Sequence, residues 1–307
     1  MASDQGPVIQ SALLRGELVR LRKERRLTQQ QVAVAMEWSP SKLIRVEGGG
    51  SSIAKVDLDA LLTKYGVTSE SHRERLHNLN HGAKEAGWWA AYKDDVSTDY
   101  LSYVGFEAGA AFIRQFQMGV VPGLLQTADY AEAVTSVGSV EPELVSTLVR
   151  LRMQRQSELA QRLAPPRQYF VLDEGVIRRH VGIKRNRDIM PNQLRSIADR
   201  AERDHLITVR VIPFEAGAHP GLIDPFTLLE FEAGLPDILF FDANRSALMI
   251  SGDDPDVANY AEHFEELLED ALSAEESIKL MRNVADIMSQ PRYSAVALDR
   301  VPELAPT

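Results

Sequence analysis

Three residues in one short stretch have the chemistry to recognise a DNA duplex. Arg45 carries a planar guanidinium whose fork of N–H donors can bond the O6 and N7 atoms of guanine together. Ser41 can bond either a base edge or a phosphate. Lys42 is better suited to a phosphate, a contact that positions a helix without reading sequence. Ser41 and Arg45 lie one helical turn apart, so a helix would place both on the same face.

The surrounding residues predict the helices that would position these side chains. Thr28 is a candidate N-cap with Gln31 at the third position of a capping box, and an apolar stripe follows at Val32, Ala33 and Met36. Ser39-Pro40 opens the next helix with a cap and then a proline at the first helical position. Its apolar side is predicted at Leu43, Ile44 and Val46, and Gly48-Gly49-Gly50 ends it.

These two helices belong to a longer helical region at the start of the chain. A preceding helix is predicted from leucines at helical spacing, namely Leu14, Leu18, Leu21 and Leu27. Two further helices are expected at about 55–65 and 70–84. The geometry required of a helix-turn-helix, one helix across the backbone and a second with its N-terminal residues in the major groove, fits this arrangement between about Leu14 and Val67.

This region resembles the XRE-type, lambda-repressor-like helix-turn-helix family. Thr28-Gln29 matches the family's opening of helix two, and Leu43 to Gly49 matches the apolar-x-x-L/V-E-x-G ending of its recognition helix. The resemblance implies that Gln29 clamps a phosphate, that Ser41 and Arg45 face the groove, and that Glu47 is structural. Pro40 departs from the pattern, at a position that often carries a polar base reader. The candidate DNA contacts are Gln29, Ser39, Pro40, Ser41, Lys42 and Arg45.

The charge distribution is compatible with nucleic acid despite a net charge of −10. Residues 1–66 hold ten Lys/Arg against seven Asp/Glu, a balance of +3, which leaves −13 for the remaining residues. Arg20, Arg22, Lys23, Arg25 and Arg26 are concentrated near the end of the first helix. Phosphate binding responds to charge within a Debye length, about 8–10 Å, rather than to whole-chain charge. A small basic face is therefore expected to dock the duplex.

No catalytic or metal constellation is expected elsewhere. The absence of cysteine excludes disulfides, thiolate metal sites and cysteine nucleophiles. Asp173 and Glu174 could form an acid/base pair, but the favoured interpretation is a helix start with acidic residues at its positive end. His219, within Gly217–Gly221, could line a ligand pocket, although a turn residue is favoured. His77 and His81 could share a metal only if a nearby glutamate completed the site. Asp173, Glu174 and His219 stay possible ligand or partner contacts. No cofactor is expected.

Beyond the helical region the pattern alternates between strand and helix. Strands are predicted near 111–118, 168–172, 207–212, 226–231, 238–242 and 246–250, and helices near 124–136, 141–163, 188–204, 254–272 and 274–288. We therefore expect a multidomain chain, an all-α helix-turn-helix domain followed by an α+β domain with a mainly antiparallel sheet. The expected boundaries are a DNA-binding domain at 1–85, an aromatic-rich hinge at 86–105, a regulatory and dimerisation domain at 106–290 and a loose tail at 291–307.

The larger part of the chain also carries a resemblance. It resembles the domain that follows the helix-turn-helix in many actinobacterial regulators, including WhiJ-like ones. The resemblance rests on Gly87-Trp88-Trp89, Val121 to Thr127, Leu172-Asp173-Glu174, Val211 to Phe214, Gly217 to Gly221 and Pro225-Phe226. The resemblance implies control of development or secondary metabolism, and pairing with a small neighbour-encoded protein in an antitoxin-like arrangement.

The sequence thus predicts a cytoplasmic, homodimeric, non-enzymatic transcriptional regulator that binds a pseudo-palindromic duplex operator and does not insert into a membrane. One alternative is an antitoxin-like interaction module whose DNA binding is secondary. A second is a small-ligand sensor or enzyme fused to the helix-turn-helix.

Overall fold

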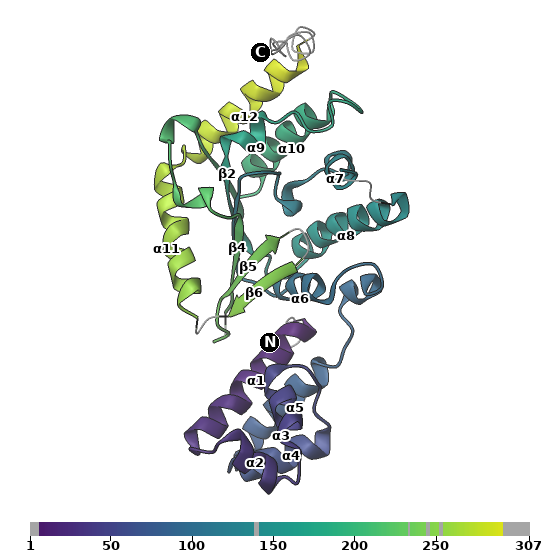
Figure 1. The fold of residues 1–307 in the computed structure, drawn as a ribbon, viewed down its shortest axis with the longest axis vertical. Helices are drawn as coiled ribbons and strands as arrows, with labels where there is room; N and C mark the ends of the chain where they lie inside the picture. Colours follow the sequence, from purple (N-terminus) through teal and green to yellow (C-terminus); the bar gives the residue numbers. More distant parts are fainter. Residues whose placement is uncertain (1–5, 138–140, 233, 244–245, 252–253, 291–307) are drawn as a thin grey trace, which may run out of the picture. The chain divides into compact units, whose positions relative to one another are not determined.

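A computed structural model describes residues 6–137, 141–232, 234–243, 246–251 and 254–290, and Figure 1 shows its elements. The chain divides into two units. Unit 1 runs to Ala111 and includes Glu230–Asp237. Unit 2 comprises Phe112–Leu229 and the described residues from Ile238 to Gln290. The loop between the predicted strands at 238–242 and 246–250 includes residues that lie outside the described part.

Unit 1 is helical, and all the helices predicted for its first 85 residues are present. Its elements are α1 (Pro7–Glu24), α2 (Gln29–Ala35), α3 (Pro40–Gly48), α4 (Lys55–Lys64), α5 (Glu70–Gly82), η1 (Trp88–Tyr92) and α6 (Thr98–Glu107). The core combines one apolar face from each of the first five helices, with Leu18, Leu43, Leu58 and Leu76 fully buried among others. Helices α2 to α5 have 13 residues or fewer, a length at which an isolated helix is marginal, so the shared core holds them in place.

The aromatic segment interpreted as a hinge forms two helices, η1 and α6, both within unit 1. Ser97 caps α6 by accepting a hydrogen bond from the Tyr100 amide. The sequence analysis did not predict α6, because the buried side of this helix is built from residues such as Tyr103, Val104 and Phe106, whose helix propensity is weak. The use of this segment as a hinge stays a prediction.

Unit 2 is an α+β unit. Its strands are β1 (Phe112–Gln117), β2 (Arg167–Asp173), β3 (Ile207–Ile212), β4 (Phe226–Glu230), β5 (Ile238–Ala243) and β6 (Ser246–Ser251). Its helices are α7 (Ala128–Thr135), α8 (Pro142–Ala160), α9 (Glu174–Arg178), α10 (Ile189–Arg203), α11 (Pro255–Asp270) and α12 (Ala274–Ser289), with short 3-10 turns η2 (Gly123–Leu125), η3 (Phe214–Ala216) and η4 (Pro220–Leu222). Each strand lies where the sequence predicted it, within about a residue.

The strands form one mixed sheet in the order β3-β2-β1-β4-β5-β6. β1 pairs with β2, and β2 with β3, in parallel register. β4 pairs with β5, and β5 with β6, in antiparallel register. The α+β class and antiparallel pairing are confirmed, and the parallel half is an addition that the sequence analysis did not foresee. Parallel neighbours need long crossovers, which α8 and α10 supply.

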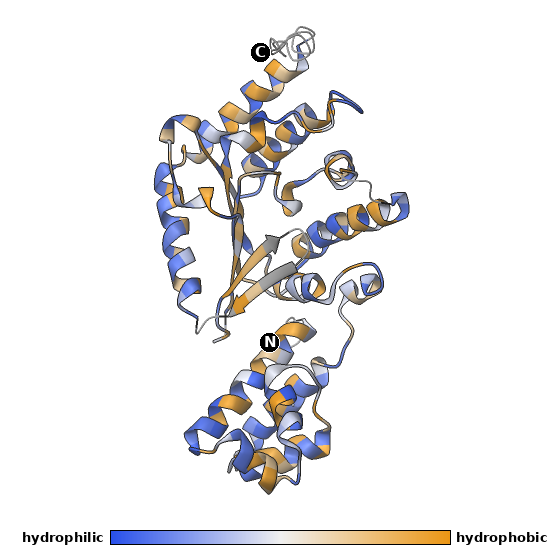
Figure 2. Ribbon diagram, in the orientation of Figure 1, coloured by the Kyte–Doolittle hydropathy of each residue, from blue (hydrophilic) through white to orange (hydrophobic). Residues whose placement is uncertain are grey.

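Helix α11 covers one face of this sheet, and α8 lies on the other side (Figure 1). Val257, Phe264 and Leu267 of α11 pack against sheet residues that include Phe116 and Phe226. The outer side of the helix is acidic and strongly hydrophilic (Figure 2). The alternation of buried and exposed residues along α11 therefore follows its helical period.

Candidate nucleic-acid interface

Local signals fix both ends of the helix-turn-helix. The Thr28 hydroxyl accepts from the Gln31 amide, and the Gln31 side chain accepts from the Thr28 amide, which completes the predicted capping box. The Ser39 hydroxyl accepts from the Lys42 amide, so Ser39 is the N-cap of α3 and Pro40 its first residue. Gly49 ends α3 in the left-handed region at φ 84°, which a glycine adopts without strain.

Helix α3 has one buried face and one exposed face. Leu43 and Val46 are buried in the core of unit 1. Ser41, Ile44 and Arg45 lie at i, i+3 and i+4 and are exposed together. Ile44 was predicted on the apolar side, but 51% of it is exposed because it is rotated away from Leu43. The exposed face therefore presents an arginine, a hydroxyl and an apolar side chain.

Arg45 is free to bind a partner. It forms no hydrogen bond or ion pair with any residue in the described part of the chain. No contact among these residues would therefore have to break before its guanidinium binds another group.

Glu47 anchors α3 from its buried side. Its side chain is only 3% exposed. Arg22 of α1 donates from Nε and Nη2 to the two carboxylate oxygens at 2.7 and 2.9 Å, and its Nη1 donates to the Leu27 carbonyl. Gln29 donates from Nε2 to Glu47 at 2.8 Å. This cluster joins α1, α2 and α3, and it positions Gln29 at the start of α2.

Lys42 is held within the unit. Its Nζ lies 2.8 Å from a carboxylate oxygen of Asp57 and 4.0 Å from the centre of the Trp38 ring. Both partners of the ion pair are about one-third exposed. Asp57 therefore neutralises part of the Lys42 charge on this side of the unit.

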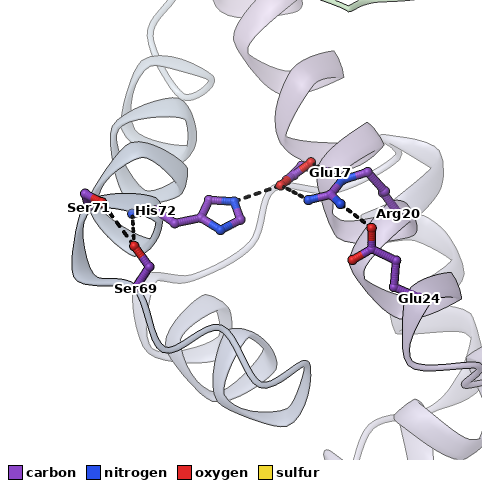
Figure 3. Close-up of polar contacts among 6 residues, drawn as sticks. All are labelled: Glu17, Arg20, Glu24, Ser69, Ser71 and His72. Atoms are coloured by element: carbon purple, nitrogen blue, oxygen red, sulfur yellow. Dashed lines mark hydrogen bonds and ion pairs between the residues drawn. The ribbon is translucent and has the colours of Figure 1, made fainter.

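The basic cluster at the end of α1 is smaller in the structure than in the sequence. Arg20 pairs with Glu17 and Glu24, as Figure 3 shows, and Arg25 donates to the carbonyls of Tyr65 and Gly66. Together with Arg22, these arginines stabilise unit 1. Ion pairs and carbonyls thus occupy three of the five members of the cluster, and the docking of a duplex by a small basic face stays a prediction.

The network in Figure 3 also ties α5 to α1. His72 Nε2 lies 2.7 Å from Glu17 Oε1, and Arg20 donates two further hydrogen bonds to the same carboxylate. The hydrogen bonding with Arg20, with a smaller contribution from His72, outweighs burial and lowers the pKa of Glu17.

The acidic pair in unit 2 has structural partners. Asp173 is the N-cap of α9 and accepts from the Gly175 amide, so the favoured helix-start interpretation is confirmed. Glu174 is buried and accepts from Arg178 and from the Phe214 amide. The structure brings His219 to this pair, with its Nε2 3.4 Å from Asp173 Oδ2. These contacts secure the loop that carries η3 and η4.

The two histidines of α5 are not joined by a metal-type cluster. His77 lies 2.7 Å from Asp59, whereas His81 is exposed and near Glu85. In the part of the chain that the structure describes, no group of three or more possible ligands gathers. Within the same ranges, no helix is long and apolar enough to cross a bilayer.

Comparison with known families agrees with this geometry. Residues 13–76 match a family model described as a helix-turn-helix domain. Fold and site together define a DNA-binding regulator of the helix-turn-helix class. Residues 100–283, more than half of the chain, match a domain of unknown function, DUF5753, and the chain belongs to this family. No curated protein and no solved structure matches the chain.

Proposed function

We propose that this protein is a sequence-specific transcriptional regulator that reads its operator through the exposed face of α3. The observation that carries the proposal is Arg45, exposed and unpaired in the described structure, on a helix whose opposite face is buried. The Glu47 cluster fixes that helix against α1 and α2. A rigid helix with a free arginine is the arrangement that direct readout of a major groove requires.

Each exposed side chain of α3 has a distinct task in this proposal. Arg45 bonds a guanine, Ser41 bonds a neighbouring base or phosphate, and Ile44 contacts a thymine methyl group. Ser39 and Pro40 begin α3 and place its first turn close to the DNA backbone. Gln29, oriented by Glu47, contacts a phosphate from the start of α2.

Lys42 contacts a phosphate after exchanging its partner. The ion pair with Asp57 is partly exposed, and such pairs contribute only about 0–1 kcal/mol. A phosphate that also releases counterions from the duplex can compete with a pair of that strength. Asp57 thereby weakens non-specific DNA binding.

Unit 2 supplies dimerisation and control in this proposal. A helix-turn-helix protein with two-fold symmetry reads two half-sites, so we infer a homodimer on a pseudo-palindromic operator. The protein works in the cytoplasm, and the resemblance to WhiJ-like regulators supports a role in development or secondary metabolism.

A small protein partner is the second element of control. Asp254 to Glu276 contains no Lys or Arg, which favours a basic partner. Next to α11, the loop secured by Asp173, Glu174 and His219 exposes Phe214, Leu222 and Ile223 at 60, 54 and 70%. Exposed apolar residues beside an acidic helix suit a partner with apolar anchors and a basic rim. The same features favour an antitoxin-like pair as the second candidate function.

Selection from a random duplex library with the full chain tests the proposed function. We expect a consensus with two related half-sites, each containing a conserved guanine, and binding that weakens steeply as salt rises. Recovery of no consensus at any salt concentration would contradict sequence-specific binding and favour the interaction module.

A further inference from the structure

A cavity of about 160 Å³ lies inside unit 1, at the end of the recognition helix. Helices α1 and α5 and the connection that follows α3 line it. An apolar cavity of about 150 Å³ is large enough to hold benzene, so this one has room for roughly six non-hydrogen atoms.

One wall of the cavity carries an arginine without an acidic partner. Arg15 donates from Nε to the Ser11 carbonyl and from Nη1 to the Gly48 carbonyl. No carboxylate in the described residues pairs with it, and burial lowers the pKa of its guanidinium. Gly49 makes room for this side chain, because a Cβ there would come within 1.6 Å of Nη1. The remaining N–H donors of Arg15 are available to an anion.

A second polar group lines the same cavity without a partner. Asn80 is only 4% exposed, and its amide forms no hydrogen bond to any residue of the described structure. The Asn80 amide atoms are not among the fully buried polar atoms that lack a partner, so they face the water-accessible space of the cavity, where a ligand can take the place of water. The rest of the lining includes apolar side chains, namely Leu14, Leu18, Val46 and Ile53.

We propose that this cavity binds a small carboxylic acid with a short apolar tail. The carboxylate bonds the free guanidinium donors of Arg15 and the Asn80 amide. The tail, of about three or four carbons, packs against Leu14, Leu18 and Val46. This ligand satisfies the charge and the unpaired amide together, and the apolar wall distinguishes it from inorganic anions.

Butyrate is the probe, and the full chain is titrated by saturation-transfer NMR without DNA, so the result does not depend on the proposed function. We expect roughly millimolar binding, as suits so small a ligand. Butyramide has the same shape without the charge, and inorganic phosphate has the charge without the tail. Butyramide should bind at least about tenfold more weakly, the range expected for losing a charge-assisted hydrogen bond. Phosphate has no carbon-bound protons, so it is added as a competitor and should leave the butyrate signal unchanged at equal concentration.

Substitutions in the cavity lining test whether butyrate binds there. Arg15→Gln should abolish butyrate binding, and Asn80→Leu should weaken it while leaving the arginine's carbonyl bonds intact. Arg75→Gln removes an exposed arginine of α5 and should leave binding unchanged. Circular dichroism checks that each variant is folded. Three results would each overturn the proposal. The first is equal binding of butyrate and butyramide, and the second is no binding of butyrate at about 50 mM. The third is parent-like binding of butyrate by both Asn80→Leu and Arg15→Gln when these variants are folded.

Discussion

Substitution within the Glu47 cluster should lower the stability of unit 1 more than substitution at its exposed positions. The Glu47 carboxylate accepts two hydrogen bonds from Arg22 and one from Gln29. Glu47→Ala removes all three and leaves the Arg22 guanidinium, whose side chain is only 13% exposed, without its carboxylate. The Arg22 bond to the Leu27 carbonyl is retained.

Removing one partner of a buried ion pair costs about 3–5 kcal/mol, mainly because a charge stays buried and unpaired. The residual exposure of Arg22 and its remaining carbonyl bond place the expected loss near the lower end, about 3 kcal/mol. That is a large share of a typical domain stability of about 5–15 kcal/mol. Arg22→Met combined with Glu47→Leu leaves no unpaired charge, so it should be less destabilising than Glu47→Ala alone.

Tryptophan fluorescence during urea unfolding measures this effect in the full chain. All three tryptophans, Trp38, Trp88 and Trp89, lie in unit 1, so the signal reports on that unit. Glu74→Ala, at an exposed position of α5, is the matched control and should change stability by less than about 0.5 kcal/mol. A loss below about 1 kcal/mol for Glu47→Ala, or a double variant as unstable as the single one, would refute the reasoning.

Three further predictions follow from charge and symmetry. Asp57→Asn should release Lys42 and tighten binding to all duplexes alike, by roughly twofold to fivefold in a low-salt titration. Unchanged affinity would argue against the proposal that Lys42 exchanges Asp57 for a phosphate. Arg20 lowers the pKa of Glu17, so the stabilisation by this carboxylate is present above its ordinary pKa of about 4.5 and is lost as pH falls through the lowered value. Glu17→Gln should therefore destabilise unit 1 at pH 7 and converge with the parent chain in acid unfolding curves; a constant difference at all pH values would contradict this. Sedimentation equilibrium should give a mass of twice 34.2 kDa, and a monomer at micromolar concentration would exclude the proposed homodimer.

Elements with strong local signals could be predicted from the sequence. The caps at Thr28 and Ser39 and the stop at Gly49 act within a single turn, and all three are present. Strand positions were also accessible, because β-branched residues dominate segments such as Ile207–Ile212. Strand direction could not be predicted, since the parallel pairing of β1, β2 and β3 depends on contacts between residues distant in sequence.

Side-chain partners distant along the chain account for the parts of the site that were not foreseen. Nothing near Lys42 indicates that Asp57 lies beside it, and Arg25 shows no local sign of its bond to the Tyr65 carbonyl. The exposure of Ile44 could have been found, because it follows buried Leu43 by one residue and a helix rotates by about 100° per residue. The cavity beside Arg15 arises from helix packing, which no local pattern records.

The effect of Arg45→Ala on base preference tests the central claim most directly. The parent chain, Arg45→Ala and the control Arg75→Ala are titrated with the selected operator and with every single-base variant of one half-site. The account predicts a loss of about 1–3 kcal/mol for Arg45→Ala and equal affinity for all four bases at one guanine position, while Arg75→Ala keeps the parent preference. An unaltered preference at every position in Arg45→Ala would contradict direct reading of the operator by α3.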